Sequence, residues 1–127
     1  MVFSGEKNCW PDADRAELYP PSDSLWRSLN AGTWLAQIDY LRDVIQEILK
    51  RYPDEEDDQR MWTSALVVDK LLPGAIVDTK RLIFQTMWGT ELSEVGSPCV
   101  AHSNGGIWRN PEDLRYQQHW EKVKAGR

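Results

Sequence analysis

The acidic stretch 53–59, Pro53-Asp54-Glu55-Glu56-Asp57-Asp58-Gln59, separates two segments that have the periodicity of amphipathic helices. Pro53 ends the first segment, and Asp54 is placed to cap the second, with Asp57 three residues further along. Acids in a first helical turn are also favoured by its free N–H groups and by the helix dipole. The stretch is therefore either a plain helix start or a helix start that aims carboxylates at a site.

The segment before this stretch, Asp39 to Tyr52, is the clearest helix of the chain. Asp39 is placed as its N-cap, and the cations Lys50 and Arg51 suit its last turn. Its apolar residues form one stripe at spacings of three and four: Tyr40, Leu41, Val44, Ile45, Ile48 and Leu49. A second helix is expected from about Glu55 to Leu71, with its inward face made of Met61, Trp62, Ala65, Leu66, Val68 and Leu72.

Strand-like runs flank the two helices, as in a layered α/β unit. Asn30-Ala31-Gly32, within one of them, predicts either a bulge packed against the next helix or a close approach of a ligand or a neighbouring element to the backbone. We expect the acidic helix start to lie near this strand. The runs are 1–5, 29–36, 75–78, 82–85 and 98–101, with 75–78 and 82–85 resembling a meander. The remainder is predicted as a long loop over 6–21 with a helical turn at 14–18, a surface excursion over 88–97 and a terminal helix over 111–124.

Composition bounds the class of protein. The chain has 127 residues, which fits a single domain over 1–127, and its net charge of -5 argues against a general nucleic-acid binder. No apolar run reaches the length of a membrane span and no signal pattern opens the chain, so we expect a soluble, cytoplasmic protein. Cys9 and Cys99 have no metal-type spacing and are expected as free thiols. The seven tryptophans provide material for stacking on a sugar ring.

His102 lies at the end of a predicted strand and is followed by Ser103-Asn104-Gly105-Gly106. A histidine in this position is either a hydrogen-bonded structural residue or a ligand. Small residues with exposed N–H groups let a phosphate approach. Histidine and carboxylates together suit Mn²⁺ or Mg²⁺. Histidine, carboxylates and a glycine-rich turn together thus fit a hard cation that holds a diphosphate, whereas a nucleophilic triad and zinc spacing are absent from the sequence.

Short motifs follow one another along residues 2–105: Val2-Phe3-Ser4-Gly5-Glu6, Cys9-Trp10-Pro11-Asp12, Tyr19-Pro20, Leu29-Asn30-Ala31-Gly32, Asp57-Asp58-Gln59, Val77-Asp78, Ile83-Phe84-Gln85, Glu91 and His102-Ser103-Asn104-Gly105. Their order and spacing resemble the glycosyltransferase domain of procollagen lysyl hydroxylases and of their viral and microbial relatives. The resemblance implies a partial GT-A-like α/β fold, a layered mixed sheet with flanking helices. It also implies transfer of glucose or galactose from a UDP-sugar, with manganese, to hydroxylysine or its galactosylated form.

The resemblance also implies roles for individual residues. It makes His102 the ligand of Mn²⁺ or Mg²⁺ and places Asn104 and Gly105 beside the diphosphate. It places Asp57 and Asp58 beside the sugar and the acceptor, where one carboxylate would assist deprotonation of the attacking hydroxyl. The donor-sugar pocket would be lined by Glu6, Trp10 and Asn30.

The sequence also departs from the family. The resemblance covers an acceptor-side half, and the family's N-terminal nucleotide-binding half, with its Asp-containing metal motif, has no counterpart in residues 1–127. Ser103 replaces a glycine, Ala31 replaces a serine, Glu55-Glu56 replace aspartates, and a lysine after the glycine turn is missing. Three functions follow: a UDP-sugar transferase completed by a second chain or by self-association, a nucleotide-, sugar- or protein-binding relative without catalysis, or a small structural or inhibitory interaction protein.

Overall fold

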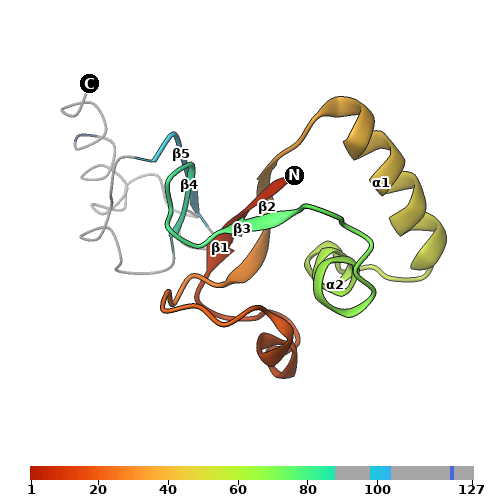
Figure 1. Cartoon of the computed structure of the whole chain (residues 1–127), viewed down its shortest axis with the longest axis horizontal. Coiled ribbons are helices and arrows are strands. Elements are labelled where there is room, and N and C mark those ends of the chain that lie inside the picture. Colours follow the sequence, from red (N-terminus) through yellow and green to blue (C-terminus); the bar gives the residue numbers. More distant parts are fainter. Residues whose placement is uncertain (88–97, 104–120, 122–127) are drawn as a thin grey trace.

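The computed structural model describes residues 1–87, 98–103 and 121. Within them, a mixed sheet with flanking helices lies beside a second, two-stranded sheet (Figure 1). The first sheet has the order β2-β1-β3, made of Ser28–Leu35, Val2–Glu6 and Ile76–Asp78, with β2 antiparallel and β3 parallel to β1. The second sheet pairs β4 (Phe84–Met87) with β5 (Val100–Ser103) in parallel. This arrangement confirms the predicted α/β class with a partial GT-A-like layered mixed sheet.

The helices lie between β2 and β3 along the chain. They are α1 (Ile38–Arg51), α2 (Asp58–Thr63) and a π-helical turn, Ser64–Val68, that continues α2. A 3-10 helix, Ala13–Leu18, lies in the long loop after β1, where a helical turn was predicted. No helix in the described part of the chain is long and apolar enough to cross a membrane.

The predicted meander of 75–78 and 82–85 is wrong, because β3 pairs with β1 whereas β4 pairs with β5. The cause is Asp78, whose buried carboxylate accepts three backbone N–H groups in the turn that follows. Leu82 N donates at 3.0 Å, Ile83 N at 2.6 Å and Phe84 N at 2.9 Å. These bonds turn the chain away from β3 and direct β4 into the second sheet.

A bulge interrupts β2. Phe3 pairs with Trp34, but the next residue of β1, Ser4, pairs with Asn30, so residues 31–33 are extra on the β2 side. The Asn30 side chain stabilises this bulge, since its Oδ1 accepts a 2.9 Å hydrogen bond from the backbone N–H of Gly32. The sequence prediction of a bulge at Asn30-Ala31-Gly32 is thus confirmed.

The hydrophobic core lies between the first sheet and the helices. Phe3 on β1 meets Trp62 of α2 edge to face, with ring centroids 5.4 Å apart, and α1 adds the buried Val44 and Ile48. The prediction of a core position is wrong for two residues: Leu49 is 57% exposed and Val68 is 48% exposed. α1 buries a narrower stripe than its sequence offers, and the π-helical turn changes the residue spacing that the prediction for Val68 assumed.

The helix starts also differ from the prediction. Asp57, not Asp54, is the N-cap of α2, and its side chain accepts a 2.8 Å hydrogen bond from Arg60 N. Residues 54–56 therefore precede the helix, and Gln37 rather than Asp39 precedes α1. Several acids in a row fit a cap equally well by local pattern, so the sequence alone placed it three residues early. The predictions for 88–97, including Glu91, and for 111–124 lie outside the described residues, apart from Glu121, which is helical.

Candidate functional site

A cavity of about 730 Å³ opens beside the bulge of β2 and the start of α2. Six of the predicted site residues line it, namely Glu6, Trp10, Asn30, Asp57, Asp58 and His102. The other lining residues are Lys7, Asn8, Trp26, Ala31, Gly32, Gln59 and Thr86. Asn104 and Gly105 lie outside the described residues. The structure therefore brings together every described residue of the predicted site.

Different elements deliver these side chains to the cavity. Glu6 ends β1, Asn30 opens the bulge of β2, and His102 lies near the end of β5. Asp57 and Asp58 come from the first turn of α2, as the sequence predicted for the acidic helix start. The cavity is thus built from segments up to about a hundred residues apart, which only the tertiary fold can join.

A buried polar cluster forms the floor of the cavity. Glu6 is 7% exposed, and its carboxylate accepts hydrogen bonds from Asn30 Nδ2 at 3.0 Å and from Gln59 Nε2 at 3.3 Å. Gln59 also accepts a 2.6 Å hydrogen bond from Ala31 N and donates to Leu29 O. Because buried polar groups are costly unless they are paired, these contacts fix the three side chains relative to one another.

Gln59 is a site residue that the sequence prediction missed. Its motif, Asp57-Asp58-Gln59, was recognised, but an amide carries no local signature of function. Its partners are 53, 30 and 28 residues away in sequence, so nothing in the local pattern indicates the contacts. Gln59 connects α2 to the ends of β1 and β2 from the inside of the cavity.

The two neighbouring aspartates have different surroundings. Asp57 uses its carboxylate to cap α2 through Arg60 N. Asp58 is the first residue of α2, and within the described residues its carboxylate makes no hydrogen bond or ion pair. Asp58 is consequently the better-placed of the two to meet a ligand in the cavity.

Two tryptophans of opposite exposure line the cavity. Trp10 is 66% exposed, so its indole offers a face for stacking, whereas Trp26 is 6% exposed. Lys7 Nζ lies 4.9 Å and Arg81 Cζ 4.8 Å from the Trp26 ring centroid, which are cation–π contacts. The high tryptophan content indicated aromatic lining, but it did not distinguish Trp10 and Trp26 from the core indoles.

Next to the cavity floor, Cys9 and Tyr19 are buried. Burial, together with the nearby Glu6 carboxylate, raises the pKa of the Cys9 thiol, and burial raises the pKa of the Tyr19 hydroxyl. Tyr19 Oη accepts a 3.1 Å hydrogen bond from Leu29 N. Both groups are therefore neutral at pH 7, and they pack beneath the floor of the cavity. Cys9 and Cys99 are free thiols, as predicted.

The side chains around the cavity can be compared with the ligands that the predicted Mn²⁺ or Mg²⁺ would need. His102 supplies an imidazole at the edge of the cavity, against the backbone at Gly32. Within residues 1–87, 98–103 and 121, no three His, Cys, Asp or Glu side chains are grouped closely enough to hold a metal ion. The described residues thus do not form a complete Mn²⁺ or Mg²⁺ site, and metal ligation by His102 stays a prediction.

Several known proteins resemble this chain in sequence. An uncharacterized protein of Acanthamoeba polyphaga mimivirus is 33% identical over 106 residues, which are 82% of this chain and 20% of the relative. The human multifunctional procollagen lysine hydroxylase and glycosyltransferase LH3 is 33% identical over 98 residues, 75% of this chain and 13% of the relative. Procollagen-lysine,2-oxoglutarate 5-dioxygenase of Drosophila melanogaster is 29% identical over 113 residues, 87% of this chain and 15% of the relative.

The chain thus spans a fifth or less of the length of these relatives. The family model described as the PLOD GT domain matches residues 1–106, which include every described residue of the cavity. The chain belongs to the PLOD GT domain family, and it is glycosyltransferase-like.

Proposed function

We propose that the cavity binds the sugar of a UDP-sugar and that a hexose is transferred there to a hydroxyl acceptor. The observation that supports this proposal is the convergence of Glu6, Trp10, Asn30, Asp57, Asp58 and His102 on one cavity of about 730 Å³. Cavities of this size accommodate small ligands. The human LH3 relative is named a glycosyltransferase, which agrees with such a site.

The chemistry requires a base for the acceptor and a polar frame for the sugar. The acceptor oxygen would form a bond to the anomeric carbon as the bond to the diphosphate breaks, and a carboxylate would take the hydroxyl proton. We assign the role of this base to Asp58, because the Asp57 carboxylate already caps α2. Glu6 and Asn30 would bind sugar hydroxyls from the cavity floor, and Trp10 would stack on the sugar face.

Binding the diphosphate of the donor requires further protein groups and a metal ion. Asn104 and Gly105 would lie beside the diphosphate, and His102 would ligate Mn²⁺ or Mg²⁺, which neutralises phosphate charge when bound. The remaining ligands would come from a second chain or from self-association, in line with the family's separate nucleotide-binding half. No step of the proposal depends on metal geometry.

UDP release tests the proposal directly. The chain, alone and mixed with the N-terminal half of a relative's domain, is incubated with Mn²⁺, UDP-glucose or UDP-galactose, and a hydroxylysine peptide. We expect acceptor-dependent UDP release that is lost in Asp58→Asn and kept in Asp43→Asn, a control on α1 whose side chain is 73% exposed. Absence of turnover with both donors under both conditions would exclude the transferase.

A second function, ligand binding without catalysis, is supported by the buried cluster of Glu6, Asn30 and Gln59. These side chains are already paired with one another, which preorganises a binding site whether or not chemistry follows. Binding alone predicts a rise in melting temperature with UDP-sugar that is lost in His102→Ala, without turnover. A flat titration would instead leave a structural or inhibitory interaction protein.

A further inference from the structure

The exposed wall of the cavity belongs to a weakly anchored segment. Residues 7–21 follow β1 and carry Lys7, Asn8 and Trp10, three of the lining residues. Cys9 and Tyr19 are buried at the two ends of this segment, but no residue between them is. Its 3-10 helix has no buried residue and no side-chain cap. Between Trp10 and Tyr19, hydrophobic contact with the core is therefore limited to the partly buried Ala16.

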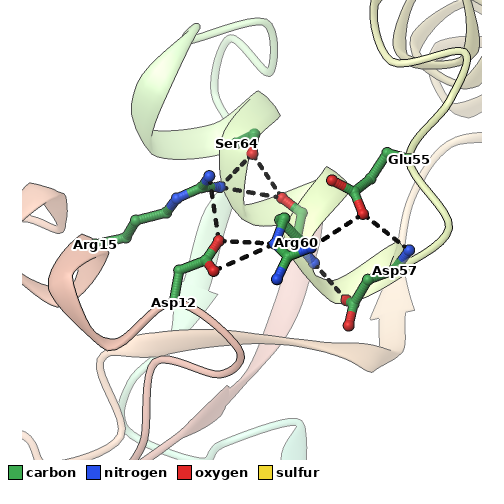
Figure 2. A network of polar contacts seen from close by, with 6 residues as sticks. All are labelled: Asp12, Arg15, Glu55, Asp57, Arg60 and Ser64. Atoms are coloured by element: carbon green, nitrogen blue, oxygen red, sulfur yellow. Dashed lines mark hydrogen bonds and ion pairs between the residues drawn. The ribbon is translucent and has the colours of Figure 1, made fainter.

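Ion pairs to α2 add a second attachment between these points. Both oxygens of Asp12 accept hydrogen bonds from Arg60 Nε, at 3.2 and 3.0 Å, and one of them also pairs with Arg15 at 3.1 Å (Figure 2). The Arg15 guanidinium reaches α2 as well, donating to the hydroxyl of Ser64 and, at 3.5 Å, to Arg60 O. Charge-assisted contacts that form a network are stronger than isolated surface pairs.

Arg60 also contacts the acidic rim of the cavity, which is formed by Asp57 and Asp58, and the neighbouring Glu55. Its Nη1 lies 3.4 Å from Glu55 Oε1, which in turn accepts a 3.1 Å hydrogen bond from the N–H of Asp57. Its own N–H donates to the Asp57 cap. Arg60 thus contacts Asp12 in the segment that carries Trp10 and, at the start of α2, Glu55 and the Asp57 cap, as Figure 2 shows.

We infer that the Asp12–Arg60 ion pair is a positioning element that holds the Trp10 wall at a fixed place beside the acidic rim of the cavity. Arg60 and Asp12 touch no ligand in this scheme, since neither lines the cavity. They act through Trp10, two residues before Asp12. The consequence for sugar binding rests on the proposed function, but the positioning itself does not.

Fluorine NMR of the whole chain labelled with 5-fluorotryptophan tests the inference without any ligand. The Trp10 resonance is assigned by its loss in Trp10→Phe. In Arg60→Met, which keeps the backbone N–H that Asp57 caps, we expect the Trp10 resonance to narrow and move toward the position of free 5-fluorotryptophan. The resonance of the core residue Trp62 should stay in place, and the melting temperature should fall by less than about 5 °C.

Two further variants make the result specific. Arg42→Met removes another arginine from an exposed ion pair, to Asp39 on α1, and should leave the Trp10 resonance unchanged. The double variant Asp12→Asn with Arg60→Met should move the Trp10 resonance no farther than Asp12→Asn alone, because the two residues act as one unit. An unchanged Trp10 resonance in Arg60→Met, or equal shifts at Trp10 and Trp62, would overturn the inference. Failure of UDP release with a moved Trp10 resonance would contradict only the proposed function.

Discussion

A Cβ atom added to Gly32 would lie 2.3 Å from Nε2 of His102 and 2.4 Å from its Cε1. Contacts below 3.0 Å are essentially never made by real Cβ atoms, so the imidazole occupies the space that a side chain at position 32 would need. A glycine in the bulge of β2 is what lets β5 bring His102 to the cavity. The same residue is part of the Leu29-Asn30-Ala31-Gly32 motif by which the family was recognised.

We predict that Gly32→Ala displaces His102 while leaving the fold intact. Gly32 itself is exposed, so the fold can absorb a small shift there, but the imidazole must rotate or β5 must move. The chemical shifts of the His102 ring protons, measured by NMR, should change, and any UDP-sugar-dependent rise in melting temperature should fall. Gly74→Ala serves as control, because its position has open space around it, although its φ of 74° adds strain. Unchanged His102 ring-proton shifts in Gly32→Ala would show that the imidazole is not confined.

The sequence predicted which residues share the cavity better than it predicted the contacts that hold them in place. Motif order brought Glu6, Asn30 and His102 into one prediction, and the structure places them on one cavity. Gln59 was not predicted as a site residue, because its hydrogen-bond partners are distant in the sequence. The cap of α2 was misplaced for a different reason: Asp54 and Asp57 fit a cap equally well by local pattern, and only the structure shows that Asp57 accepts the Arg60 N–H.

Periodicity predicted the elements, and long-range pairing decided how they assemble. The apolar spacing of 39–52 indicated α1 correctly within a residue at each end. In contrast, the runs at 75–78 and 82–85 are strands, as predicted, that belong to different sheets. A local pattern cannot show that the Asp78 carboxylate accepts the backbone N–H groups of the turn between them.

Replacing Asp78 should therefore destabilise the junction between the two sheets. Asn at this position keeps one acceptor oxygen for three buried or partly buried N–H donors, and its amide N–H would face another donor. We expect Asp78→Asn to lower the free energy of unfolding by about 1–3 kcal/mol. Urea unfolding measures the change, with Asp39→Asn, an exposed acid on α1, expected within about 0.5 kcal/mol of the parent. Equal losses in the two variants would contradict the turn as the cause.

Tyr52 should make stability depend on alkaline pH. Burial, and a 2.6 Å hydrogen bond donated by its hydroxyl to Asp69, raise the pKa of Tyr52 to about 12 from 10.0. Because the folded state favours the protonated phenol, this stabilisation is fully present below pH 10 and is lost as the pH rises through about 12. Unfolding in urea at several pH values should show that Tyr52→Phe declines less than the parent between pH 10 and 12. Parallel curves for the two proteins would show that Tyr52 does not contribute.

Substitutions can distinguish the roles of the two aspartates at the start of α2, because only Asp57 caps the helix. Asn caps a helix about as well as Asp, whereas Ala does not, so Asp57→Ala should cost about 1 kcal/mol of stability and Asp57→Asn should cost little. Asp57→Asn therefore removes the charge while it preserves the hydrogen bond to Arg60 N.

If Asp58 is the base, as we propose, Asp57→Asn should retain most of the turnover measured by UDP release, and Asp58→Asn should lose it at unchanged stability. Thermal unfolding of each variant supplies the matching stability measurement. The opposite pattern, with turnover lost in Asp57→Asn and kept in Asp58→Asn, would reassign the base to the residue that also caps the helix. In that case the carboxylate would accept both the Arg60 N–H and the acceptor proton, which its two oxygens permit.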